Sequence, residues 1–234
     1  MAKKDGGKAV QLLVWDLPTR LFHWCLVTLV TISLLTGLGW TWLEDEAEIH
    51  EWSGIGVLVL LVFRLFWGFV GGRHARFADF LAGPKSIMKY AKEVLTGTLV
   101  HWRGHNPIGG LSVFAMLTLL IAQVGTGLFA NDDSEYEAPL FDLIEKDTSD
   151  WLTTWHYDIA TAIYYLIGIH IAAILFYRFK GEKLTGPMIH GRKPSATHAK
   201  SERGPAESGH PVRALIVLAV SVGLAYAILA LGDW

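Results

Sequence analysis

Five long apolar stretches constrain this chain of 234 residues more than any other feature. They lie approximately at residues 21–43, 50–70, 108–130, 151–177 and 212–231. About 20 apolar residues are needed to cross a bilayer as a helix, and a helix hydrogen-bonds its own backbone inside the lipid. Hydrophobic residues make up 52% of the chain and charged residues only 18%. The sequence therefore predicts an all-α integral membrane protein.

The Lys and Arg residues fall on alternate connections between these stretches. Residues 1–20 hold four of them, residues 71–108 hold six and residues 178–213 hold eight, whereas the connections around 44–48 and 132–150 are acidic. Basic connections of this kind stay in the cytoplasm. We therefore expect a multi-pass protein of the bacterial inner membrane, with its N-terminus in the cytoplasm and its C-terminus in the periplasm.

The same pattern divides the chain into four parts. We expect an N-terminal cytoplasmic segment at 1–20, a four-helix domain at 21–180, a flexible cytoplasmic linker at 181–211 and a fifth transmembrane helix at 212–234. Within the long basic connection, residues 84–95 predict a short amphipathic helix lying on the membrane.

Composition excludes several kinds of protein. Cys25 is the only cysteine, which rules out a disulfide scaffold, a c-type haem attachment and a cysteine-ligated iron–sulfur cluster. A net charge of −2 gives no footprint for nucleic acid, so we expect no nucleic-acid partner.

Four of the ten histidines lie in or beside the apolar stretches, where an ionisable group is expensive and is a functional candidate. The other six lie in basic connections or the linker and are expected to be solvated: His74, His101, His105, His190, His198 and His210.

The four membrane histidines resolve into two pairs. His156 and His170 are 14 residues apart, so they lie on one helix face, separated by about 21 Å along the axis. The expected topology places His50 at the depth of His156, near the outer surface, and His23 at the depth of His170, near the inner surface. Two such pairs are what two bis-histidine b haems require as metal ligands.

Neighbouring residues fit the same hypothesis. Gly37 and Gly54 lie where a glycine would let a flat macrocycle approach the backbone, although close helix packing uses glycine too. Arg64 and Arg20 lie near the inner pair and are candidates to bind haem propionates. Alternatively, Arg64 extends to the interface and Arg20 is an ordinary cytoplasmic anchor.

Three segments carry a resemblance to a known family. Val14-Trp15-Asp16-Leu17-Pro18-Thr19-Arg20-Leu21-Phe22-His23-Trp24, the turn Gly104-His105-Asn106-Pro107-Ile108-Gly109-Gly110 and Gly168-Ile169-His170 resemble the bacterial cytochrome b561 family. This family is similar to the b-type cytochrome subunits of nickel–iron hydrogenases and the membrane subunits of formate dehydrogenases. The resemblance covers about residues 12–180, and the fifth helix departs from the shorter four-helix members.

The resemblance implies two haems b, an inner one on His23 and His170 and an outer one on His50 and His156. It also implies a quinone site near the inner haem, for which Asn106 is the candidate by its position in the turn.

The expected function is electron transfer across the membrane, as a subunit of an oxidoreductase complex. The carrier would connect quinone or quinol with a periplasmic redox partner, a c-type cytochrome or a hydrogenase-like enzyme. The acidic connection 132–150 would attract a basic partner, or it is merely solvated. A homo-oligomer in membrane lipid is compatible with the sequence.

Three alternatives stay open. One is a stand-alone enzyme passing electrons from a small donor such as superoxide to quinone. The second is a haem-free, proton-coupled transporter using the histidines and Asp158 as proton relays, and the third is a membrane anchor.

Overall fold

The computed structural model describes residues 11–40, 44–97, 102, 104–134, 136–194 and 210–232. Five of its helices are long and apolar enough to cross a membrane. They are α1 (Leu17–Gly37), α2 (Glu46–Val70), α5 (Pro107–Gly127), α6 (Lys146–Phe179) and α8 (Pro211–Leu229). The predicted fold class, a helical membrane bundle with a fifth C-terminal helix, is confirmed.

Two of the long helices begin at side-chain caps. Asp16 Oδ1 accepts a hydrogen bond of 2.9 Å from the Thr19 amide at the start of α1, and its Oδ2 accepts one of 3.1 Å from the Gly72 amide. Asn106 Oδ1 accepts a bond of 2.7 Å from the Gly109 amide at the start of α5. Such caps satisfy amides that have no partner within the helix. Asp16 also joins the start of α1 to the end of α2.

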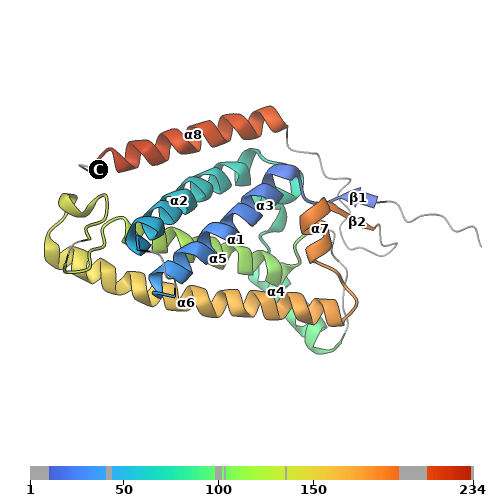
Figure 1. The fold of residues 1–234 in the computed structure, drawn as a ribbon. Coiled ribbons are helices and arrows are strands. Elements are labelled where there is room, and N and C mark those ends of the chain that lie inside the picture. Colours follow the sequence, from blue (N-terminus) through green and yellow to red (C-terminus); the bar gives the residue numbers. More distant parts are fainter. Residues whose placement is uncertain are drawn as a thin grey trace, which may run out of the picture.

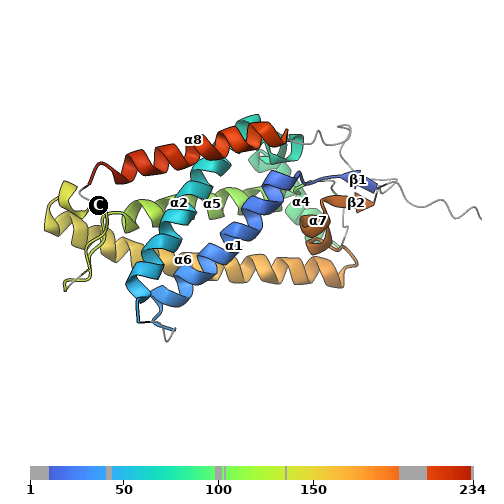
Figure 2. The ribbon, with the colours of Figure 1, turned by 45° about the horizontal axis from the view of Figure 1, so that its top comes forward.

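The bundle is centred on α2, which packs against α1, α5 and α8, while α5 packs against α6. Figures 1 and 2 show α8 running beside α2 along the edge of the bundle. Buried apolar side chains of α2 fill the centre together with residues of the other four long helices: Phe22, Val57, Leu61, Phe63, Trp67, Leu117, Leu120, Ile163 and Val217. The long helices expose many large apolar side chains on their outer faces, as a lipid-facing surface requires.

The two ends of the bundle differ in charge. The basic end carries the starts of α1 and α5 and the ends of α2 and α6, and the acidic end carries the connections from α1 to α2 and from α5 to α6. Small elements gather at the basic end, on the right in Figure 1. They are η1 (Arg73–Ala75), α3 (Phe77–Phe80), α4 (Pro84–Leu95), α7 (Thr185–His190), β1 (Gln11–Leu13) and β2 (Arg192–Pro194). A turn of 3-10 helix, η2 (Phe141–Leu143), lies in the acidic connection.

Helix α4 has the bounds that the sequence predicted for a surface helix, 84–95. The two strands were not predicted. They pair antiparallel, Gln11 opposite Pro194 and Leu13 opposite Arg192. The segment 181–211, expected to be a flexible linker, therefore begins with the ordered elements α7 and β2, and its residues 195–209 lie outside the described part. The strands could not be predicted because three residues are too short to show a periodic pattern, and each strand pairs with a segment far away in the sequence.

Candidate functional site

His50 on α2 and His156 on α6 face each other near the acidic end. Their ring centroids are 6.1 Å apart and their planes are inclined by 75°. We call them the acidic-end pair. Both line a cavity of about 520 Å³ between α1, α2, α5 and α6, which is within the usual range for bound small molecules and cofactors.

The backbone holds both rings of the acidic-end pair. His50 Nδ1 lies 3.0 Å from the Ser33 carbonyl oxygen on α1, and His156 Nδ1 lies 3.0 Å from the Gln123 carbonyl oxygen on α5. Each histidine ring is thus held by a backbone carbonyl of a neighbouring helix, His50 by α1 and His156 by α5. Helix α6 packs closely along α5, but among the described residues it does not pack closely along α1 or α2. Space is therefore left between the helices that carry the paired histidines.

Gly37 and Gly54, the two glycines expected to lie beside a haem, both line the cavity. A Cβ at Gly54 would meet nothing within 4 Å, so this position leaves open space beside His50. A Cβ at Gly37 would lie 3.1 Å from His50 Cε1. Gly37 therefore makes room for the histidine ring itself.

His23 on α1 and His170 on α6 form the second pair, which we call the basic-end pair. They lie close enough to interact electrostatically. His23 Nδ1 is buried and, among the described residues, has no hydrogen-bond partner. Among the described residues, His23 therefore lacks the backbone anchor that both rings of the acidic-end pair possess.

Arg64 lies inside the bundle near the basic-end pair and is only 3% exposed. Its guanidinium carbon is 4.9 Å from the centre of the Phe77 ring and 5.7 Å from that of Phe80. The carboxylate of Asp16 interacts with the Arg64 guanidinium electrostatically. Even so, Nη1 of Arg64 is buried without a hydrogen-bond partner among the described residues. Arg64 does not extend to the membrane surface, and its unpaired donor suits an anion bound in the interior.

Arg20 connects α1 to α7. Its Nη1 donates a hydrogen bond of 2.5 Å to the Ile189 carbonyl oxygen, and nearby the Trp24 indole donates one of 3.2 Å to the Met188 carbonyl oxygen. Arg20 is therefore an anchor between two elements of the basic end, and its Nε is buried without a hydrogen-bond partner among the described residues.

Asn106 uses both of its side-chain polar groups. Besides capping α5, it donates from Nδ2 to the Tyr177 hydroxyl at 3.1 Å, and that hydroxyl lies 2.9 Å from the Tyr90 hydroxyl. Asn106 thus joins the start of α5 to the end of α6 and to α4. The structure gives it this structural role, whereas a quinone contact remains a prediction.

His105 was expected to be solvated, and this is wrong. Its ring packs between Trp15 and Phe80, with centroid distances of 4.6 and 4.9 Å. Burial, together with the nearby charge of Arg64, lowers the pKa of His105 to about 3. His105 is therefore neutral at physiological pH. The sequence placed it in a polar turn and could not show that the turn folds back over the bundle.

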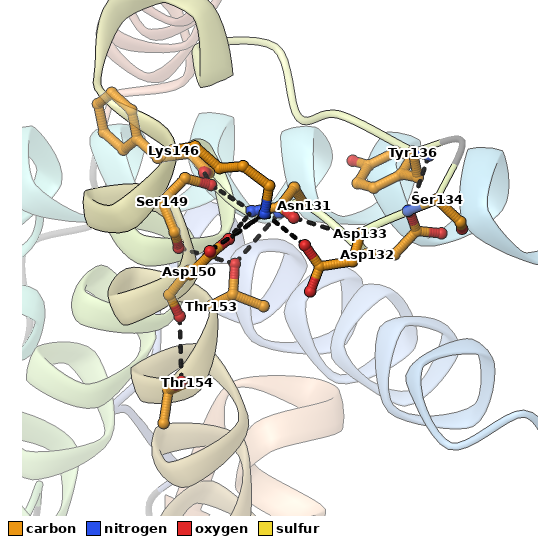
Figure 3. Close-up of polar contacts among 11 residues, drawn as sticks. Asn131, Asp132, Asp133, Ser134, Tyr136, Lys146, Ser149, Asp150, Thr153 and Thr154 are labelled. Carbon is orange, nitrogen blue, oxygen red and sulfur yellow. Dashed lines mark hydrogen bonds and ion pairs between the residues drawn. The ribbon is translucent and has the colours of Figure 1, made fainter.

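The acidic connection is held by a polar network at the start of α6 (Figure 3). Asn131 donates to Ser149 Oγ at 2.6 Å and to Asp150 at 2.9 Å, and Lys146 donates to both Asp150 and Asp133. The one lysine of this connection is thus engaged by two of its carboxylates. Other acidic residues, Glu48, Glu51 and Asp132, line a shallow hollow with Tyr136 beside them.

Sequence reasoning missed the residues that hold the acidic-end pair. They are Thr36, Gln123, Thr126 and Gly127, which contact His50 or His156. One signal was available, because the tripeptide Thr-Gly-Leu occurs at residues 36–38 and again at 126–128. These positions are the ends of two transmembrane helices.

The fold and the site define a multi-pass helical membrane protein with paired histidines at two depths of one bundle. Residues 14–191 match the family described as prokaryotic cytochrome b561, and the chain belongs to this family. The resemblance seen in the sequence is confirmed.

Two curated relatives carry the same name, "Probable Ni/Fe-hydrogenase B-type cytochrome subunit". The protein from Rhizobium leguminosarum bv. viciae is 27% identical over 226 residues, covering 82% of this chain and 94% of the relative. That from Bradyrhizobium diazoefficiens is 24% identical over 228 residues, covering 82% and 91%. The chain is accordingly a b-type membrane cytochrome of electron transfer.

The residues present fit a haem b. Within the described ranges no three His, Cys, Asp or Glu side chains gather as they would around a metal ion, but a haem iron needs only axial ligands from the protein. The cavity beside His50 and His156 and the open space at Gly54 suit a flat cofactor at the acidic end, and the unpaired Arg64 donor suits an anionic group near the basic-end pair.

Proposed function

We propose that this chain holds two haems b, one on His50 and His156 and one on His23 and His170, and carries electrons across the membrane. The acidic-end pair supports this most directly, because two histidines from different helices face each other beside a cavity of about 520 Å³. A haem with two histidine ligands supplies reversible one-electron transfer.

Helix α6 provides one ligand to each site. Its 34 residues run without interruption, so the 14 residues between His156 and His170 separate the two sites by about 21 Å along the axis. A rigid helix thus fixes the spacing of the two centres, with one near each end of the bundle.

The remaining candidate residues have distinct roles in this proposal. Arg64 would hold a propionate through its unpaired Nη1, and Arg20 would add its buried Nε. Gly54 leaves space for the macrocycle.

We place the redox partner at the acidic end, outside the cytoplasm according to the charge of the connections. Glu48, Glu51 and Asp132 lie together at this end, and a basic protein surface would be attracted to them. The names of the relatives favour a hydrogenase as the partner, and a c-type cytochrome with a basic surface fits the same charge.

Quinone or quinol would exchange electrons at the basic end, beside the turn that Asn106 begins. The Asn106–Tyr177–Tyr90 chain of hydrogen bonds offers polar hydrogens at this end. Orientation in the bacterial inner membrane belongs to the same proposal, because it rests on the positive-inside rule.

The test is haem counting in detergent-purified protein by the pyridine haemochrome assay, with reduced-minus-oxidised spectra. The wild type should hold close to two haems b with a low-spin spectrum, whereas H156A and H170A should each hold about one. The haem remaining in each variant should differ in midpoint potential. Folded protein without haem would overturn the proposal and favour the proton-relay transporter, and loss of the same haem in both variants would overturn the pairing.

A further inference from the structure

Two helix ends present the same set of contacts to the two histidines of the acidic-end pair. Helix α1 ends at Thr36-Gly37, which contacts His50, and helix α5 ends at Thr126-Gly127, which contacts His156. We call these two dipeptides the Thr-Gly ends.

At the first Thr-Gly end, His50 Nδ1 lies 3.0 Å from the Ser33 carbonyl oxygen and 3.1 Å from Thr36 Oγ1. The Thr36 hydroxyl donates its own hydrogen to the Ile32 carbonyl oxygen at 2.9 Å. A carbonyl oxygen can only accept, and the hydroxyl has already donated, so the proton of this contact must be on His50 Nδ1. His50 Nε2 therefore carries the lone pair.

The second Thr-Gly end repeats this geometry. His156 Nδ1 lies 3.0 Å from the Gln123 carbonyl oxygen and 3.3 Å from Thr126 Oγ1, and the Thr126 hydroxyl donates to the Ala122 carbonyl oxygen at 2.9 Å. Gln123 provides a further indication, because its side-chain Nε2 lies 2.9 Å from His156 Nε2. An amide nitrogen donates, so His156 Nε2 accepts and carries the lone pair, as the same tautomer requires. A metal bound at this nitrogen would replace the Gln123 amide.

The glycine of each Thr-Gly end lets the imidazole lie against the helix backbone. A Cβ at Gly37 would be 3.1 Å from His50 Cε1, and a Cβ at Gly127 would be 2.7 Å from His156 Cε1. A larger residue would push either ring away from the carbonyl oxygen that holds its Nδ1.

We propose that Thr36-Gly37 and Thr126-Gly127 are duplicated positioning elements, which keep the proton on Nδ1 of His50 and His156 and so present Nε2 of both as the ligand atom. This inference rests on the proposed function. Hydrogen bonds from Nδ1–H to an acceptor fix the tautomer of a metal-binding histidine and raise its basicity. A more basic ligand favours the oxidised iron, so the Thr-Gly ends lower the potential of the centre that they serve.

The basic-end pair provides an internal reference. His23 Nδ1 is buried without a hydrogen-bond partner among the described residues. Neither Thr-Gly end contacts this histidine, and each contacts a histidine of the acidic-end pair. Substitution of either threonine should therefore shift one potential and leave the other unchanged.

The test uses T36V and T126V in the full-length haem-loaded protein, with T31V and T118V as matched controls. The control threonines also donate to a carbonyl oxygen of their own helix, Thr31 to Val27 at 2.7 Å and Thr118 to Phe114 at 3.0 Å, but they are exposed. Midpoint potentials of both haems are measured by redox titration, with haem content and low-temperature EPR spectra.

We expect T36V and T126V each to raise the potential of the acidic-end haem, and the double variant to raise it further. T36S and T126S should restore the wild-type value, and the controls should leave both potentials unchanged. An acidic-end potential in T36V and T126V equal to that of the controls would overturn the inference. Failure of the proposed function itself is distinguished by haem content, because the wild type would then hold no haem or H50A would keep as many haems as the wild type.

Discussion

Gly127→Ala tests whether the acidic-end pair needs contact between a histidine ring and the helix backbone. The new Cβ would lie 2.7 Å from Cε1 and 3.1 Å from Nδ1 of His156, whereas ordinary van der Waals contact begins at 3.4 Å. The ring must therefore withdraw by about 0.7 Å. Such a shift would lengthen the Nδ1 to Gln123 carbonyl distance of 3.0 Å to as much as roughly 3.7 Å, where the hydrogen bond is weak or lost.

Loss of such a supporting bond typically lowers metal affinity about 10- to 100-fold, which corresponds to about 1.4–2.7 kcal/mol. We expect purified Gly127→Ala protein to contain about one haem by the pyridine haemochrome assay, and His170 to hold the one that remains. A Cβ at Gly37 would meet His50 at 3.1 Å, so Gly37→Ala should lose less haem than Gly127→Ala.

Gly125→Ala is the matched control for this change. It lies on the same helix, two residues away and exposed, and its Cβ would meet nothing within 4 Å. An alanine stabilises a helix by up to about 1 kcal/mol relative to glycine, so this variant should keep both haems. Equal haem content in Gly127→Ala and Gly125→Ala would contradict the role given to the contact.

Three further outcomes are expected. Gly54→Ala places a methyl group in the cavity without touching protein atoms, so it should lower the haem content of the acidic-end site although alanine raises the stability of haem-free protein by up to about 1 kcal/mol. Normal haem loading would show that this wall of the cavity is not used. Arg64→Met removes a buried cation near the basic-end pair, so the midpoint potential of that haem should fall in a redox titration, whereas Arg213→Met, at the start of α8, should leave it unchanged. The pKa of His105 is lowered from 6.5 to about 3, so between these values the unfolded chain binds more protons and the free energy of unfolding falls as the pH drops, by at most about 1.4 kcal/mol per pH unit. His105→Gln should reduce this dependence in melting curves recorded from pH 7 to pH 4, and an unchanged slope would contradict it.

Much of the fold could be predicted because a membrane leaves few choices. Each apolar stretch has to form a helix, so the five long helices follow from length and composition alone. Pairing His50 with His156 needed only helical periodicity and the alternation of charge. In the structure the centres of these two rings are 6.1 Å apart.

The contacts around the site could not be predicted in the same way. His105 lies in a turn whose sequence looks polar, yet the turn folds against Trp15 and Phe80. Asn106 stands where a binding residue was expected, and its amide joins α5 to α6. Each of these contacts joins residues far apart in the chain, and no local pattern records them.

The sequence by itself determined the five helices, the charged ends and the position of each histidine along its helix, because all of these depend on hydrophobicity, charge and helical rise. Only the tertiary structure decided which backbone carbonyl holds each ring and which glycines the rings touch. It also decided that Arg64 is buried beside aromatic rings. These features depend on how neighbouring helices are rotated and shifted against one another. That is fixed by side-chain packing, which periodicity does not encode.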